Sequence, residues 1–354
     1  MAKKIRVGFI GTGRPYNTTG STGYGMAYEH ARGYKALPDV ELAACADLKK
    51  ENGNAFAEHN GVKTVYTDYN KMLKLEKLDM VSICTWPHLH APMALAAIKA
   101  GVKAVHCEKP MAFTWGESVQ MAAAAKKRGC RLTFNHQRRF GEPFQKALQI
   151  VKSGKIGKTL RLEAFPPNLY DWGTHWLDML NMWNGESRAK WVIGQLDART
   201  EVRVYGAPME NQGIWQVLYE NGVHGLISTG SELGQGAALR VIGEQGVVEI
   251  DWHEPILRVL TKGEWEIIPV KENLHGPGYV ERAIADAVKA LRNGTVSQLC
   301  AENALVSTEI IFAAYESSRR RGRVDMPLTA KDNPLEAMIQ KGMIEPKPKP
   351  KKGK

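Results

Sequence analysis

The sequence has 354 residues, of which 44% are hydrophobic and 24% are charged. That length suggests two domains or one large one, and that composition excludes disorder over most of the chain. No apolar run reaches the roughly 18 residues that a membrane-spanning helix needs, and the first residues lead directly into an expected strand instead of a signal-peptide core. We therefore expect a cytoplasmic protein with no membrane partner.

Charge and cysteine usage exclude two further classes. The formal net charge is +11, but the final PKPKPKKGK stretch supplies five of these charges, and no basic cluster interleaved with aromatic residues precedes it. We therefore expect no nucleic-acid partner. The five cysteines lack C-x-x-C spacing, and His88 and His90 lack a third ligand nearby, which predicts reduced thiols and no bound metal.

The first part of the chain alternates short apolar runs with amphipathic segments, which is typical of repeated βαβ units. Several of the amphipathic segments close on glycine, as helices prefer. The expected strands span residues 5–10, 41–46, 63–66, 80–85, 103–107 and 131–135. We predict an N-terminal Rossmann domain with a doubly wound parallel sheet over residues 1–135.

The pattern changes after residue 135. We expect a strand at 159–165, consecutive strands without helices from 191 to 270, and a hairpin turn at Asn221 and Gly222. The expected helices span 144–152, 173–183, 279–292 and 301–320. These elements predict a C-terminal α/β domain with an open, mostly antiparallel sheet over residues 136–330, followed by a polar Lys/Pro-rich tail over 331–354 that is disordered at its end.

The first expected strand runs into Gly11, Thr12 and Gly13, the opening of a dinucleotide-binding turn whose glycines let the backbone approach a pyrophosphate. The third glycine of that pattern would fall at Tyr16, and an insertion over residues 14–24 precedes the next helix. On these residues alone, a glycine pair that only turns the chain is the alternative.

The second expected strand ends in Asp47. A carboxylate at this position can accept hydrogen bonds from an adenosine ribose diol and would repel a 2′-phosphate. Asp47 therefore predicts NAD, in preference to NADP, as the cofactor.

Three further strings join the glycine turn: ICTWPHLHAPMALAAIKAG at 83–101, VHCEKP at 105–110 and DWGTHWLD at 171–178. Together with FNHQRRF at 134–140 and VIGEQGVVEID at 241–251, they resemble the glucose-fructose oxidoreductase/inositol dehydrogenase family, also called Gfo/Idh/MocA, over residues 4–328. The resemblance implies NAD(P)-dependent oxidation or reduction of sugars, polyols and related compounds, and a C-terminal sheet that mediates oligomer contacts.

The resemblance also implies roles for single residues. It makes Lys109, Asp171 and His175 catalytic. It adds the following residues to the cofactor site already expected at the glycine turn and Asp47: Thr85, Trp86, Pro87, His90, Glu108, Lys109 and Asn135. Substrate contacts are expected from the three catalytic residues, from Trp172, whose ring can stack on a sugar, and from Arg138. Arg138 and Arg139 are candidates for binding an anionic substituent, or they are salt-bridged surface residues.

Elementary chemistry supports these roles. Oxidising an alcohol needs a base for the hydroxyl proton while hydride leaves to the nicotinamide C4. Lys109 precedes Pro110, which holds it extended at the carboxyl edge of a strand, where open α/β sheets bind ligands. Asp171 and His175 face the same side if their helix begins at Asp171. His175 then takes the proton while Lys109 holds the hydroxyl oxygen, or the two roles are reversed.

These observations leave more than one activity open. Oxidation or reduction of a secondary hydroxyl on a sugar, polyol or glycoside, by a homo-oligomer, is the leading hypothesis. The alternative is a redox-neutral glycoside hydrolase with tightly bound NAD, because oxidation, elimination, water addition and reduction would use the same three residues. Their presence argues against a sugar sensor without catalysis. Only five residues, PPNLY, separate the expected strand that ends near Phe165 from Asp171. This short connection predicts an open substrate pocket, or one that another element such as the 14–24 insertion closes.

Overall fold

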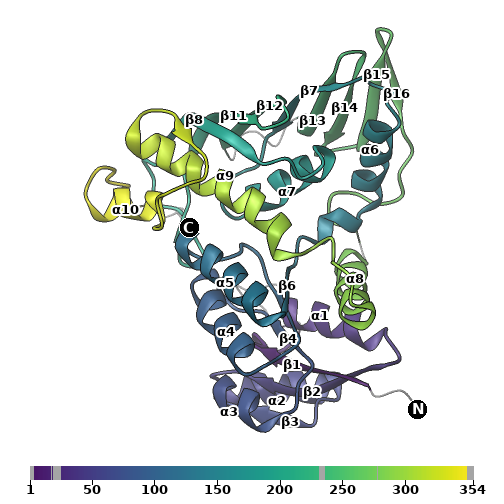
Figure 1. Cartoon of the computed structure of the whole chain (residues 1–354), viewed down its shortest axis with the longest axis vertical. Helices are drawn as coiled ribbons and strands as arrows, with labels where there is room; N and C mark the ends of the chain where they lie inside the picture. Colours follow the sequence, from purple (N-terminus) through teal and green to yellow (C-terminus); the bar gives the residue numbers. More distant parts are fainter. Residues whose placement is uncertain (1–3, 17, 19–24, 231–235, 277, 349–354) are drawn as a thin grey trace, which may run out of the picture. The chain divides into compact units, whose positions relative to one another are not determined.

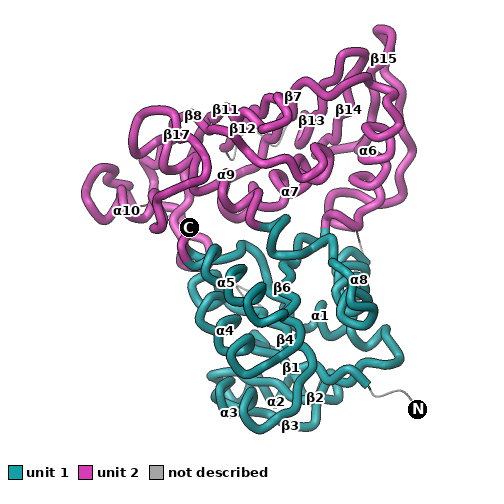
Figure 2. Tube along the Cα trace, viewed as in Figure 1, with its two compact units in different colours: residues 1–113, 117–137, 278–304 teal, residues 114–116, 138–277, 305–354 magenta. Residues whose placement is uncertain are grey.

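A computed structural model describes residues 4–16, 18, 25–230, 236–276 and 278–348. The chain divides into two compact units (Figure 2). Unit 1 comprises residues 1–113, 117–137 and 278–304, and unit 2 comprises residues 114–116, 138–277 and 305–354. The segment 278–304, which the sequence analysis assigned to the C-terminal domain, thus groups with the N-terminal unit.

Unit 1 is built on a six-stranded parallel sheet with the order β3-β2-β1-β4-β5-β6 (Figure 1). Its strands are β1 (Ile5–Ile10), β2 (Val40–Ala46), β3 (Thr64–Tyr66), β4 (Met80–Ile83), β5 (Ala104–Cys107) and β6 (Arg131–Phe134). Its helices are α1 (Met26–Lys35), α2 (Lys50–Asn60), α3 (Tyr69–Leu75), α4 (Pro87–Lys99), most of α5 (Trp115–Arg128), and α8 (Tyr279–Asn293). This strand order confirms the predicted Rossmann fold.

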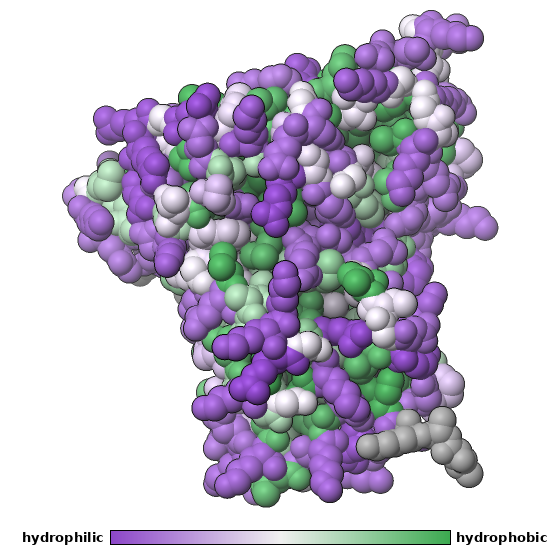
Figure 3. All heavy atoms as spheres, viewed as in Figure 1, coloured by the Kyte–Doolittle hydropathy of each residue, from purple (hydrophilic) through white to green (hydrophobic). Residues whose placement is uncertain are grey.

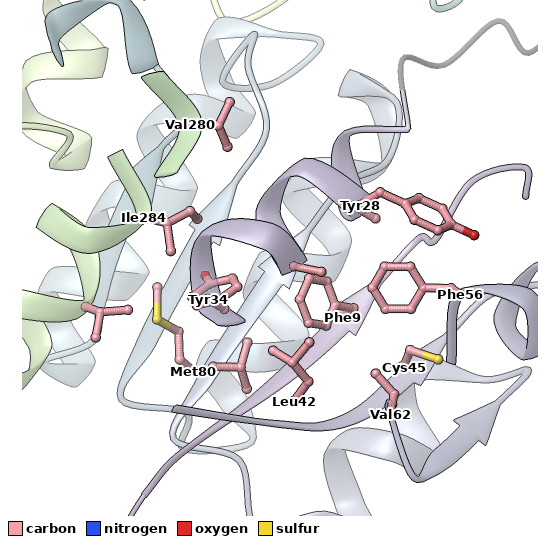
Figure 4. Packing of buried hydrophobic residues seen from close by; sticks show 14 of the residues in the cluster. Phe9, Tyr28, Tyr34, Leu42, Cys45, Phe56, Val62, Met80, Val280 and Ile284 are labelled. Carbon is pink, nitrogen blue, oxygen red and sulfur yellow. The ribbon is translucent and has the colours of Figure 1, made fainter. Parts of the chain in front are cut away.

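A shared hydrophobic core explains why α8 belongs to unit 1 (Figure 4). Val280 and Ile284 of α8 pack in one cluster with Phe9 of β1 and Tyr34 of α1. The two helices approach closely at Gly33, because a Cβ there would lie 3.0 Å from the Cβ of Ile284. The helix that closes this core thus comes from a distant part of the sequence.

Unit 2 is built on a nine-stranded sheet with the order β16-β15-β14-β13-β7-β12-β11-β8-β17. Its strands are β7 (Thr159–Ala164), β8 (Ala189–Asp197), β11 (Gln212–Tyr219), β12 (His224–Gly230), β13 (Ala237–Gly243), β14 (Gly246–Asp251), β15 (Leu257–Thr261), β16 (Glu264–Ile267) and β17 (Val324–Asp325), beside a small sheet of β9 (Arg203–Val204) and β10 (Ala207–Pro208). Only the β7–β12 pair is parallel among the described strands of the large sheet, which confirms a mostly antiparallel sheet. The predicted hairpin joins β11 to β12, and Gly222 in its turn has a φ of +84°.

Helices pack on this sheet, and one more helix follows its last strand along the chain. They are the 3-10 turn η1 (Gln137–Phe140), α6 (Glu142–Lys152), α7 (Gly173–Trp183), α9 (Ala301–Arg320) and α10 (Pro334–Gln340). Helix α10 lies in the stretch predicted as a polar tail. Asn333 caps it by accepting a hydrogen bond from the N–H of Glu336 at 3.2 Å, and Leu335 and Met338 are buried. Residues 349–354, where the end of the tail was expected, and positions 17 and 19–24 of the insertion lie outside the described residues.

Figure 3 colours one face of the molecule by the hydropathy of its residues. Hydrophilic residues cover most of the face of the units drawn in Figure 3, and hydrophobic residues are scattered between them. Among the described residues, no helix is long and apolar enough to cross a membrane.

One ion pair lies inside unit 2. Nε and Nη2 of Arg139 each donate to one carboxylate oxygen of Asp178 at 2.7 Å, and both side chains are almost fully buried. Nη1 of Arg139 also donates to Glu186 at 2.5 Å. Arg139 is therefore salt-bridged in the interior and not at the surface, and it fixes η1 to α7.

We predict that Asp178→Asn lowers the free energy of unfolding by about 3 kcal/mol, because the buried guanidinium loses its bidentate partner. Asp197→Asn is the matched control, since it breaks an exposed pair with Arg199 that contributes at most about 1 kcal/mol. Urea unfolding followed by circular dichroism measures both. Equal losses in the two variants would contradict the special role of the buried pair.

Candidate active site

The turn after β1 fits the pyrophosphate of a dinucleotide. Gly11 and Gly13 have φ values of +80° and +70°, a region that favours glycine. A Cβ on Gly11 would lie 2.8 Å from the carbonyl oxygen of Cys84, whereas a Cβ on Gly13 would meet no atom of the described residues within 4 Å. The first glycine therefore packs against the end of β4.

Asp47 lies against the same turn. Its Oδ2 accepts hydrogen bonds from the N–H and the hydroxyl of Thr12, both at 2.9 Å, and from the N–H of Gly13 at 3.3 Å. Its Oδ1 accepts a hydrogen bond from the N–H of Lys49 at 2.9 Å. The N–H groups of Thr12 and Gly13 thus bond to Asp47 and hold its carboxylate against the glycine turn.

The residues after β4 form the next part of the site. Helix α4 begins at Pro87, and Trp86, which precedes it, is 46% exposed. The ring nitrogens of His90 lie 3.0 Å from the carbonyl oxygen of Thr85 and 2.9 Å from that of Pro110. Burial lowers the pKa of His90, which favours the neutral ring. His90 therefore lies between the loop after β4 and the loop after β5, its neutral ring can donate to one of the two carbonyls, and its side chain is fully buried.

The E-K-P turn follows β5. Lys109 is half-buried and is joined to Pro110 by a cis peptide bond. The buried carboxylate of Glu108 accepts hydrogen bonds from the Asn135 side chain at 2.7 Å and from the N–H of Lys109 at 3.2 Å. Glu108 and Asn135 thus bond to each other inside the unit and support the turn that carries Lys109.

The sequence analysis missed a histidine in this region. His30 of α1 is fully buried, with Nδ1 2.7 Å from the Ser82 hydroxyl and Nε2 2.8 Å from Glu108. Burial opposes a charge on His30, but Cys84 and Glu108 favour one and raise its pKa to about 10. Burial likewise opposes the Glu108 carboxylate, but His30 lowers its pKa to about 2. A lone histidine in a helix gives no signal in the sequence that could have revealed this pair.

The other candidate residues come from unit 2. Helix α7 begins at Gly173, as expected, so the condition under which Asp171 and His175 would share a helical face is not met. Asp171 lies in the turn before it, where Oδ1 of Asn168 accepts hydrogen bonds from the N–H of Asp171 at 2.9 Å and of Trp172 at 3.1 Å. His175 lies in the first turn of α7 and is buried. Asparagine favours turns because its side chain bonds to nearby main-chain groups, and this preference could have identified Asn168.

The short PPNLY segment is bonded to a buried glutamate, Glu210. Glu210 accepts hydrogen bonds from the N–H of Leu169 at 2.5 Å and from the Tyr315 hydroxyl at 2.6 Å. Burial raises the pKa of Glu210. The turn that carries Asp171 is therefore anchored to the interior of unit 2.

Arg138 lies in a cluster of aromatic rings in unit 2. Its guanidinium carbon is 5.4 Å from the ring centroid of Trp172 and 4.9 Å from that of Trp176, and its Nη2 is 3.2 Å from Nδ1 of His275. Trp176 stacks on Trp252 with 5.0 Å between ring centroids. Trp172 and Trp252 are half-buried. The structure therefore brings Arg138 and Trp172 together, and it adds Trp252 and His275, which come from segments that sequence motifs did not mark.

Metal ligands form no cluster in the part of the chain that the structure describes: no group of three or more His, Cys, Asp or Glu side chains could hold an ion there. The five cysteines are free thiols.

Two family models match the chain. An oxidoreductase family with an NAD-binding Rossmann fold matches residues 5–136, and the C-terminal α/β domain of the same family matches residues 161–326. The chain therefore belongs to the Gfo/Idh/MocA oxidoreductase family, as its motifs predicted. It is an NAD-dependent oxidoreductase, which agrees with the glycine turn.

Individual proteins resemble this chain at low sequence identity. An uncharacterized oxidoreductase of Bacillus subtilis is 26% identical over 72% of this chain and 76% of its own length. The D-glucoside 3-dehydrogenase of Escherichia coli is 32% identical over 44% of this chain and 41% of its own length, so this chain spans less than half of that relative. The crystal structure of an oxidoreductase domain protein from Kribbella flavida superimposes with a TM-score of 0.76 at 21% identity, over 92% of this chain and all of that one, and shows the same fold.

We predict that Asp47→Ala weakens NAD binding by about tenfold and removes a preference for NAD over NADP, because the carboxylate gains hydrogen bonds from a ribose diol and repels a phosphate. Fluorescence titrations with both cofactors measure this. Glu51→Ala is the control, since it removes an exposed carboxylate from the first turn of α2. Equal affinity of the wild type for the two cofactors would contradict the assignment of Asp47 to the ribose.

Proposed function

We propose that this protein oxidises or reduces a secondary hydroxyl of a sugar, polyol or glycoside. The observation that carries the proposal is the carboxyl edge of the parallel sheet, where the glycine turn, Asp47 and Lys109 follow three of its strands. The name of the D-glucoside 3-dehydrogenase supports a carbohydrate substrate.

In this proposal NAD, when bound, supplies the nicotinamide that accepts or returns the hydride. The turn at Gly11, Thr12 and Gly13 binds the pyrophosphate, and Asp47 binds the adenosine ribose. The residues after β4, namely Thr85, Trp86 and Pro87, border the nicotinamide end. His90, Glu108 and Asn135 are also predicted as cofactor residues. In this proposal these buried side chains affect the cofactor indirectly, by positioning the loops after β4 and β5.

Proton transfer is assigned to Lys109 and His175, with Asp171 as the third catalytic residue that the family resemblance implies. In one arrangement the imidazole of His175 takes the hydroxyl proton while the ammonium of Lys109 holds the oxygen. In the other, Lys109 takes the proton. Trp172 offers an apolar face to a sugar ring, and Arg138 adds positive charge behind that face.

We predict that Lys109→Ala lowers turnover by about 10²-fold or more while the affinity for NAD changes by only a few-fold, since general acid–base groups contribute 10²–10⁴. Lys99→Ala is the control, because Lys99 is an exposed lysine at the end of α4. Absorbance at 340 nm with a panel of sugars and glycosides provides the assay. A loss of NAD binding equal to the loss of turnover would make Lys109 a structural residue.

The same panel separates the two candidate activities. Net formation of NADH from added NAD supports the dehydrogenase. Release of the aglycone without added NAD, and without net NADH, supports the redox-neutral hydrolase.

We also propose that two copies of the chain associate through the nine-stranded sheet. On one of its faces, the buried carboxylates of Glu163 and Glu249 alternate across the strands with Arg240 and Arg258, which are partly exposed and pair with them. Exposed Ile193 and Ile214 lie on the same face farther along the sheet. Ile193 pairs with Gln216, which is two residues from Ile214. Gln216 also pairs with Leu226, and Leu226 pairs with Glu163. A sheet face whose carboxylates are already paired, and which exposes apolar side chains, can bury these side chains against a second copy of itself.

Replacing Ile193 and Ile214 together by Glu should convert an oligomer to smaller species, because two charges would be buried in the interface. Analytical ultracentrifugation measures the mass. Val296→Glu, at an 81% exposed position of unit 1, should leave the mass unchanged. A monomeric wild type at micromolar concentration would contradict the proposal.

A further inference from the structure

A chain of hydrogen bonds connects the interior of unit 1 to the main chain of Lys109. It begins at His30 of α1, whose Nε2 lies 2.8 Å from Oε1 of Glu108. The same oxygen accepts a hydrogen bond from Asn135 at 2.7 Å. The second oxygen of Glu108 accepts a hydrogen bond from the N–H of Lys109 at 3.2 Å.

We propose that His30 is a positioning residue for Lys109, which it orients through the carboxylate of Glu108. The imidazolium of His30 bonds to one carboxylate oxygen of Glu108. The other oxygen then stays directed at the main-chain N–H of Lys109, the residue that carries the amine. This inference rests on the proposed function, because Lys109 must act on the substrate for its orientation to affect turnover.

The surroundings of His30 favour its charged form. The titratable groups that face it are the Glu108 carboxylate, the Cys84 thiol with Sγ 3.4 Å from Nδ1, and the ring of His106 with 5.0 Å between centroids. Tyr34, one turn later on α1, lies near the same Ser82 and Cys84.

Only one of these neighbours could compete with His30 for a positive charge. Burial lowers the pKa of His106 to about 3, so that ring stays neutral. The Ser82 hydroxyl, 2.7 Å from Nδ1, can accept the second N–H of the imidazolium. A charged His30 therefore has a partner for each of its N–H groups, and the carboxylate has a partner for each of its oxygens.

The pair also links folding to pH. The folded-state pKa of His30 lies above its ordinary value of about 6.5, so its contribution to stability is complete below pH 6.5 and is lost as the pH rises through about 10. The folded-state pKa of Glu108 lies below its ordinary value, so its contribution is present above about pH 4.5 and is lost as the pH falls through about 2.

The first measurement uses the wild-type protein and does not depend on activity. In ¹⁵N-histidine NMR spectra at pH 8, one ring should give the shifts of an imidazolium. That signal should be absent from His30→Gln and become neutral in Glu108→Gln. A neutral His30 ring in the wild type at pH 8 would overturn the proposal, even if neither variant folds.

The second measurement is the pH dependence of turnover. With His30→Gln, kcat at pH 7 should fall about tenfold while Kd for NAD changes less than threefold. An acidic limb absent from the wild type should also appear, because Glu108 without its cation takes up a proton at higher pH. His30→Gln combined with Glu108→Gln should lose that limb.

His106→Gln is the matched control, since it removes a neighbouring buried imidazole that bonds to Thr133 instead of Glu108. It should leave the shape of the pH profile unchanged. If Lys109→Ala does not lower turnover, the proposed function is wrong. If Lys109→Ala lowers turnover but His30→Gln keeps the wild-type profile and kcat, the proposed function stands and the role of His30 is refuted.

Discussion

The parallel register of the six-stranded sheet is the constraint on which the candidate site of unit 1 depends. Ile10 of β1 pairs with Ala46 on one side and Ile83 on the other, and the pairing continues through Cys107 to Phe134. Parallel strands in this register end at the same level. The residues that follow them therefore lie in one row along the carboxyl edge: Gly11, Asp47, Cys84, Glu108 and Asn135.

The strand ends remain connected beyond the last paired residues. The N–H of Gly11 donates to Ala46, that of Cys84 to Ile10, and those of Glu108 and Asn135 to Ile83 and Cys107, each at 2.9 Å. These bonds fix the main chain where the side chains of the site begin. The row then divides by burial: Asp47 is half-exposed at the glycine turn, whereas Glu108 and Asn135 turn inward and pair with each other.

Buried charge recurs in both units, and each time it joins segments that are distant in the chain. The His30–Glu108 pair joins α1 to the loop after β5, and the Arg139–Asp178 pair joins η1 to α7. An unpaired charge at either position would be costly in a low-dielectric interior, so each partner restricts where the other segment can lie. The polar interior is thus part of what positions the functional loops.

The sequence by itself determined the elements and most of the motif positions. Alternating apolar runs located all six strands of the parallel sheet, Asn221 and Gly222 located a hairpin, and local strings located the glycine turn, Asp47, the E-K-P turn and the helix with His175. These features depend on neighbours within a few residues, and short-range patterns therefore record them.

Only the tertiary structure decided which side chains face inward and which distant segments complete each unit. His30 could be recognised as part of a buried pair only because Glu108, 78 positions away, lies next to it in the fold. In the same way, α8 belongs to the core of unit 1 through its contacts with β1 and α1. Trp252 and His275 joined Arg138 and Trp172 from two separate loops, one after β14 and one before α8. Burial and charge pairing arise when the whole chain has packed, and a linear pattern contains no information about the partner until the fold brings it near.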